Sequence, residues 1–110
     1  MRFISDEPMQ EWLRDFVPDP ERFDWDAGNE RKGLKHGVAQ GEIESIFFHS
    51  YLFAGRITEP AHDEWRGLIL GESESERLLA LIFTRRGDRI RPISCRPMRK
   101  KEREFYEANH

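Results

Sequence analysis

The sequence contains one cysteine among its 110 residues, Cys95, which excludes an internal disulfide framework and a zinc site made of cysteines alone. It lacks any apolar run near the roughly 20 residues of a membrane-spanning helix. Its first residues turn acidic at Asp6 without the apolar centre of a signal peptide. We therefore expect a cytoplasmic protein that has no membrane partner.

Other functional signatures are missing as well. The chain has no Gly-rich phosphate loop and no serine in the setting of a nucleophile elbow. Its four histidines show no metal-binding spacing, and His62, beside Asp63 and Glu64, forms the only acidic–histidine cluster. We therefore expect neither a metal nor another cofactor.

The sequence does contain enough apolar residues for a core, and its charge is unevenly distributed. Hydrophobic residues make up 37% and charged residues 35% of a chain whose length suits one domain. The formal net charge of −3 conceals a basic segment, residues 85–103, in which nine basic and two acidic residues give a net charge of +7. Most of these bases are arginines, whose forked guanidinium groups match phosphate oxygens. The segment predicts an anionic partner, and a nucleic acid is the first candidate. The alternative is a solvated basic face that balances the acidic N-terminal half.

Hydrophobic periodicity and turn residues predict the order of the elements. An amphipathic helix is predicted from Met9 to Val17, with Asp6 as its cap and Pro18 at its end. Helices are also predicted at 26–35, at 39–47 and from 97 onward, and strands at 50–56, 65–71, 78–84 and 89–95. The near-continuous apolar run 78–84 is typical of a central strand that is covered on both faces.

These elements predict an α+β fold in which helices pack on one side of a small antiparallel sheet of about four strands. The alternating segment Phe23–Asp26 would add a short edge strand. Residues 1–20 would be a helical N-terminal extension, and residues 21–110 a single domain. The apolar side chains of the first helix, Trp12, Leu13 and Phe16, could belong to the core or form a homodimer contact.

Two local patterns could carry acid–base chemistry. His36 follows Lys35 at the predicted end of a helix, where the helix dipole favours a protonated imidazole, so it could act as a general acid or base or simply cap the helix. Glu64 and Arg66 would share one face of a strand. They could be a base and a phosphate clamp, or an ion pair of small energetic value.

The segment from Arg89 to Arg96 is the third pattern. In a regular strand Arg89 and Arg91 share one face, while Ser94 and Arg96 share the other. Arg91 lies among apolar neighbours, which predicts an anionic partner or ligand. Pro92 has no N–H and therefore indicates an edge strand or a bulge. We expect Cys95 to pack as a small apolar residue.

Three stretches, taken in order, resemble the BrnT toxin family. The first is Phe-Asp-Trp-Asp at 23–26, followed by Lys-His-Gly-Val at 35–38. The second is Glu-Trp-Arg at 64–66, which leads into Leu-Ile-Leu-Gly at 68–71. The third runs from Thr84 through the basic residues to Arg96 and continues to Tyr106. The resemblance covers residues 23 to about 107, in the family's order and roughly its spacing.

The resemblance implies the toxin of a type II toxin–antitoxin pair, with a RelE-like fold, that cleaves RNA without a metal. It also implies a BrnA-like antitoxin as the partner, with RNA as the substrate. We expect such an RNA endonuclease to inhibit translation. The alternative is a non-catalytic basic module that binds an antitoxin-like protein or a nucleic acid.

For the nuclease hypothesis we assign roles by residue type. Glu64 or His36 would carry protons, Arg66 and Arg96 would clamp the transition state, and Lys35 would add supporting charge. The remaining basic side chains would hold the RNA backbone: Arg86, Arg89, Arg91, Arg99, Lys100, Lys101 and Arg103.

Overall fold

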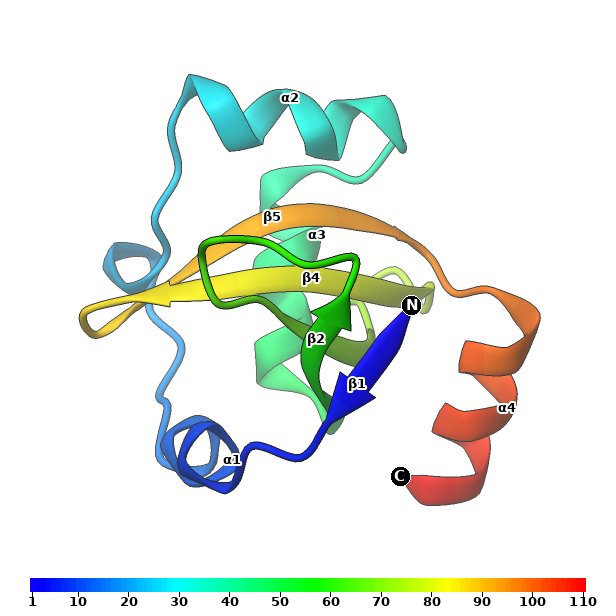
Figure 1. The fold of residues 1–110 in the computed structure, drawn as a ribbon. Coiled ribbons are helices and arrows are strands. Elements are labelled where there is room, and N and C mark those ends of the chain that lie inside the picture. The colour runs from blue at the N-terminus through cyan, green and yellow to red at the C-terminus, as the bar shows by residue number, and fades with distance from the viewer.

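The structure, a computed structural model, describes residues 1–110 except for the side chains of residues 32–34. Its centre is an antiparallel five-stranded sheet in which neighbours in sequence are neighbours in space (Figure 1). The strands are β1 (Arg2–Ile4), β2 (Tyr51–Glu59), β3 (Gly67–Glu72), β4 (Leu78–Arg86) and β5 (Arg89–Pro97). The four predicted strand segments correspond to β2, β3, β4 and β5 within a few residues, but the sheet has five strands where about four were predicted.

The fifth strand is not the one that the sequence predicted. Phe23 makes only an isolated parallel bridge to Ile90 on the edge of β5. The additional strand is β1, which pairs with β2 at the opposite edge of the sheet. It has three residues, all exposed, so it carries no alternation of apolar and polar residues that would mark it as a strand.

Four α-helices surround this sheet: α1 (Glu7–Arg14), α2 (Ala27–Lys35), α3 (Gln40–Ser45) and α4 (Lys100–Asn109). Short 3₁₀ turns occupy 20–22 and 46–48. The Asp6 carboxylate accepts a hydrogen bond from the backbone N–H of Met9, which confirms the predicted cap of α1. After α2 the chain reverses at Gly37, which has a φ of 70° that side chains with a Cβ rarely adopt.

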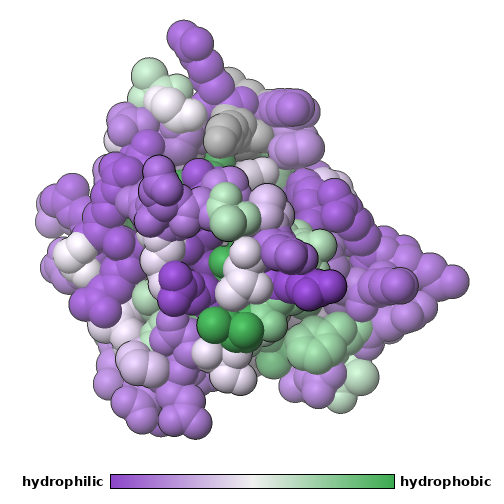
Figure 2. All heavy atoms as spheres, in the orientation of Figure 1, coloured by the Kyte–Doolittle hydropathy of each residue, from purple (hydrophilic) through white to green (hydrophobic). Residues whose placement is uncertain are grey.

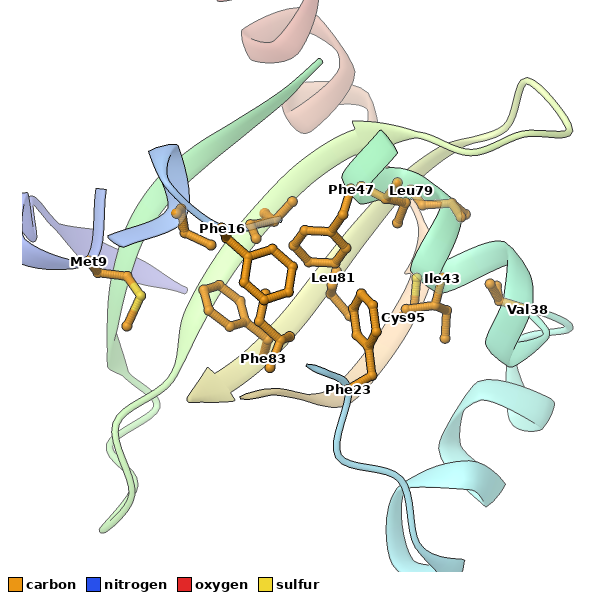
Figure 3. Packing of buried hydrophobic residues seen from close by; sticks show 14 residues of the cluster. Met9, Phe16, Phe23, Val38, Ile43, Phe47, Leu79, Leu81, Phe83 and Cys95 are labelled. Carbon is orange, nitrogen blue, oxygen red and sulfur yellow. The ribbon is translucent and has the colours of Figure 1, made fainter. Parts of the chain in front are cut away.

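One face of the sheet is covered by α1, α3 and the aromatic residues around them (Figure 3). Phe16 packs edge to face against Phe23 and Phe47, and all three rings belong to the same core as Leu81 and Phe83 of β4. The buried side of α1 belongs to this core, because Met9 and Leu13 are buried with them. That helix face is therefore filled by the chain's own core, and a dimer contact through Leu13 and Phe16 is not available.

The other face is covered by α4, which corrects the expectation that all helices lie on one side. Tyr106 of α4 and Met98 before it pack with Leu68 and Leu70 of β3 and with Ala80 of β4. Within the described part of the chain, no helix combines the length and apolar character needed to cross a membrane.

A bulge in β5 changes which side chains share a face. The pairing with β4 is regular on both sides of Ile93 but shifts by one residue there, beside Pro92. The bulge that Pro92 predicted is thus confirmed. Because a bulge adds one residue, Arg91 and Arg96 lie opposite Thr84 and Ala80 and point to the same face, not to opposite faces.

Candidate active site

A small polar pocket lies where the segment before β3 and the strands β4 and β5 present charged residues beside the start of α2. Its volume is about 200 Å³. It opens on the sheet face that α4 also covers, because Arg66, Arg86 and Arg91 occupy alternate or cross-strand positions of that face. The residues that line it are Gly28, Asn29, Glu64, Arg66, Arg86, Arg91 and Ile93.

Arg66 is the most unusual member of the pocket. Its carbonyl oxygen accepts a hydrogen bond from the backbone of Ile57, which fixes the residue at the start of β3. Its side-chain Nε is buried and has no hydrogen-bond partner, unlike the other buried side-chain nitrogen and oxygen atoms in the described part of the chain. A buried donor without an acceptor is costly, so a pocket lined by this guanidinium is suited to an anionic ligand.

Glu64 reaches the pocket from the loop before β3. Its carboxylate accepts hydrogen bonds from Nε and Nη2 of Arg86, at 3.2 and 3.4 Å. Asp24 lies 3.7 Å from the same guanidinium. The ion pair between Glu64 and Arg66 that the sequence left open does not form, since Arg86 of β4 takes that position. Both Glu64 and Arg86 remain partly exposed, so solvent and ligands can reach them.

Arg91 has the anionic partner that its apolar surroundings predicted. Its two terminal nitrogens donate to the Asp26 carboxylate at 3.0 and 3.1 Å, and Asp24 lies 3.6 Å away. The Arg91 hydrogen bonds, helped by the backbone N–H groups of Gly28 and Asn29, hold the pKa of Asp26 below its ordinary value. Asp26 in turn raises the pKa of Arg91. The pair ties the start of α2 to β5.

Asn29 completes this attachment from inside. It is buried, accepts a hydrogen bond from the backbone of Asp26 and donates from Nδ2 to the carbonyl oxygens of Asp24 and Pro92. Asp24, Asp26 and Asn29 were missing from the predicted site. The sequence did indicate that Arg91 needs an anionic partner. It does not show that this partner is Asp26, which lies 65 positions earlier in the chain.

The structure does not bring Lys35 and His36 to this pocket. Lys35 is the last residue of α2 and His36 follows it, eight residues beyond Gly28 and roughly 12 Å away in the direction of the helix. His36 is only partly buried there, and Lys35 is exposed. Their catalytic roles stay predictions, but the geometry separates them from Glu64 and Arg66.

Arg96 is also apart from the pocket. It lies five residues beyond Arg91 on β5, roughly 16 Å along the strand. Its terminal nitrogens donate to both oxygens of Glu102 on α4, at 2.7 and 3.0 Å, and both side chains are largely buried. Burial alone would raise the pKa of Glu102, but the hydrogen bonds from Arg96 and from the backbone of Arg99 outweigh it and lower that pKa.

This ion pair predicts an acid-sensitive attachment of α4. A pKa that is lower in the folded than in the unfolded chain means that ionised Glu102 stabilises the fold above its ordinary value of 4.5, and that this contribution is lost as the pH falls through the lowered value. We expect Arg96→Gln to reduce the free energy of unfolding by about 1–3 kcal/mol at pH 7 and to flatten the acid dependence. Urea denaturation at a series of pH values measures both. An unchanged acid dependence in the variant would contradict this role.

The other predicted RNA-binding residues are exposed on the surface but do not line the pocket. Arg89 is exposed at the start of β5, beyond the hairpin turn. The remaining four are exposed along the beginning of α4, which packs on the same sheet face as the pocket: Arg99, Lys100, Lys101 and Arg103. Their arrangement provides positive charge on this side of the molecule.

The described residues contain no group of three histidine, cysteine or acidic side chains close enough to hold a metal ion. Cys95 is buried in the core, as expected, and burial raises its pKa to about 12, so the thiol stays protonated.

The fold and the pocket together define a small α+β protein in which three arginines and a carboxylate line one polar pocket beside the sheet. Residues 25–102 match the family described as the ribonuclease toxin BrnT of type II toxin–antitoxin systems. This match spans more than two thirds of the chain, which therefore belongs to the BrnT family. A comparison with curated proteins gave no match. Membership implies a ribonuclease that acts on RNA and is paired with an antitoxin.

Proposed function

We propose that the pocket between Glu64 and Arg66 cleaves RNA as an endonuclease that needs no metal ion. The single observation that supports this most is the buried, unpartnered Nε of Arg66, which lines a pocket shared with an exposed carboxylate. A phosphodiester in the pocket offers acceptor oxygens to the Arg66 guanidinium, whose side chain lines it. It also places the adjacent ribose next to a group that can take a proton.

The reaction uses the substrate's own hydroxyl as the nucleophile. Glu64 takes the proton from the ribose 2′-OH, the 2′ oxygen bonds to phosphorus, and the bond from phosphorus to the 5′ oxygen breaks. Solvent reaches the exposed carboxylate and supplies the proton that the departing 5′ oxygen gains. The products are a 2′,3′-cyclic phosphate and a 5′-hydroxyl. The reaction therefore needs neither a water molecule as the nucleophile nor a metal ion.

Arg66 and Arg86 stabilise the charge that builds up on phosphorus. Both guanidinium groups line the pocket, and fixed donors aimed at a developing charge are worth far more there than in water. Arg91 contributes differently, because it is nearly buried and paired with Asp26, so it positions α2 and the pocket wall. The exposed basic residues of β5 and α4 guide the RNA backbone.

Cleavage of a long RNA in the presence of EDTA tests the proposal. We expect the purified protein to cut it and to leave 2′,3′-cyclic phosphate and 5′-hydroxyl ends, which end-labelling and mass spectrometry identify. Arrest of an in vitro translation reaction, with fragmentation of its messenger RNA, is the expected consequence for protein synthesis. Intact RNA with tight RNA binding would instead support the non-catalytic module.

A further inference from the structure

An apolar groove lies between the first strand and the last helix. It has a volume of about 310 Å³, and Phe3 of β1 and Phe105 of α4 line its two sides above Leu68 and Leu70. These phenylalanines are 37% and 48% exposed, although large apolar side chains are usually covered. Figure 2 shows apolar atoms gathered between β1 and α4, in the lower right of the view, with hydrophilic residues around them. Met1 and Ile4, which lie near Phe3 in the sequence, are also exposed.

The groove continues into the candidate active site. Leu68 and Leu70 point to the same face of β3, and Arg66, two residues before Leu68, points to that face as well. Successive side chains on one face of a strand are about 7 Å apart. A chain that lies in the groove and follows β3 therefore reaches the pocket of Arg66 and Glu64 within one or two residues.

The charge around the groove is positive. Lys101 lines it, and Arg99, Lys100 and Arg103 are exposed at the start of the same helix, whereas the exposed acids Glu104 and Glu107 follow in its later part. The acidic residue of the lining, Glu102, is neutralised by Arg96. An occupant that combines apolar side chains with carboxylates satisfies both the groove and its rim.

We propose that this groove binds an acidic segment of the antitoxin, with apolar side chains seated between Phe3 and Phe105 and carboxylates on Lys101 and its neighbours. The bound segment covers the approach to the RNA site, so that the antitoxin neutralises by competing with RNA; this last step rests on the proposed function. A second copy of the toxin fits less well. A two-fold contact across the groove would bring the basic side chains of the two α4 helices together.

The dissociation constant of the complex with the antitoxin tests this surface. The probe is the purified antitoxin of the same toxin–antitoxin pair, and isothermal titration calorimetry measures its binding. We expect Phe105→Ser to weaken binding at least about 10-fold, because it removes a central apolar contact. The matched control is Phe48→Ser, since Phe48 is 66% exposed but lies next to the core of the opposite sheet face. Lys101→Glu should weaken binding and reduce its salt dependence.

The outcomes separate the proposal from its rivals. Equal dissociation constants for Phe105→Ser and Phe48→Ser would overturn it, and so would a toxin dimer in analytical ultracentrifugation that Phe105→Ser dissociates. Should Phe105→Ser melt before the wild type, Phe3→Ser on the opposite wall gives the same comparison. Free Phe105→Ser should still cleave RNA in EDTA. If the wild type cleaves no RNA, the proposed function fails, while the dissociation constants still decide where the antitoxin binds.

Discussion

Replacing Arg66 with alanine is expected to slow RNA cleavage at least about 100-fold while the protein stays folded. Arg66 has no partner for its buried Nε, so the substitution breaks no observed side-chain hydrogen bond. The substitution removes a positively charged donor from the pocket. We therefore expect a large loss of cleavage rate and only a small change of the melting temperature. Single-turnover cleavage of a defined RNA in EDTA gives the rate, and circular dichroism during heating gives the melting temperature.

The control for this variant is Arg14→Ala, an exposed arginine at the end of α1 on the other side of the sheet's core. It removes the same charge and should leave the cleavage rate within about twofold of the wild type, because surface charges far from a site are screened. Arg66→Lys should recover only part of the lost rate, since an ammonium group cannot reproduce the guanidinium fork. Cleavage by Arg66→Ala at the wild-type rate would refute the assigned role.

Glu64→Gln should reduce the cleavage rate by about 100-fold or more, whereas His36→Asn should change it little. The sequence allowed either residue to carry the proton. The structure places Glu64 in the pocket with Arg66 and leaves His36 beyond the far end of α2. Glutamine keeps the size of the side chain and its ability to accept from Arg86, but it cannot take a proton from the 2′-OH.

The same single-turnover assay compares these two variants with the wild type. RNA affinity, measured by fluorescence anisotropy at matched salt, shows whether the loss lies in chemistry or in binding. We expect Glu64→Gln to bind RNA at least as tightly as the wild type, because it removes a negative charge from the pocket. A large loss in His36→Asn with full activity in Glu64→Gln would reverse the assignment.

Much of the fold could be predicted because its signals are local. The apolar run of β4, the Asp6 cap of α1 and the Gly37 reversal each depend on a few adjacent residues. The strand β1 could not be predicted, since its three exposed residues form a strand only by pairing with β2, more than 50 residues away. The prediction that all helices pack on one side of the sheet was wrong for α4 for a similar reason. Few apolar anchors mark its buried face, and long-range contacts decide it.

The candidate site was predicted in part. Glu64, Arg66, Arg86 and Arg91 were singled out from the sequence, and they do line one pocket. Their pairing could not be predicted, because each ion pair joins residues that are distant in the chain. The bulge in β5 decides where Arg96 points. In a regular strand Arg96 and Arg91 would point to opposite faces of the sheet. The extra residue turns both side chains to the same face, where Arg96 pairs with Glu102 of α4.

The walls of the groove come from the two ends of the chain. Phe3 is two residues from the amino terminus, and Phe105 is five residues from the carboxyl terminus. An affinity tag or fluorescent fusion at either end would therefore emerge beside this surface, where a flexible, charged peptide can occupy it. Antitoxin titrations made with such fusions would report a weaker interaction than the native protein has, so the tag should be removed by protease before the affinities are compared.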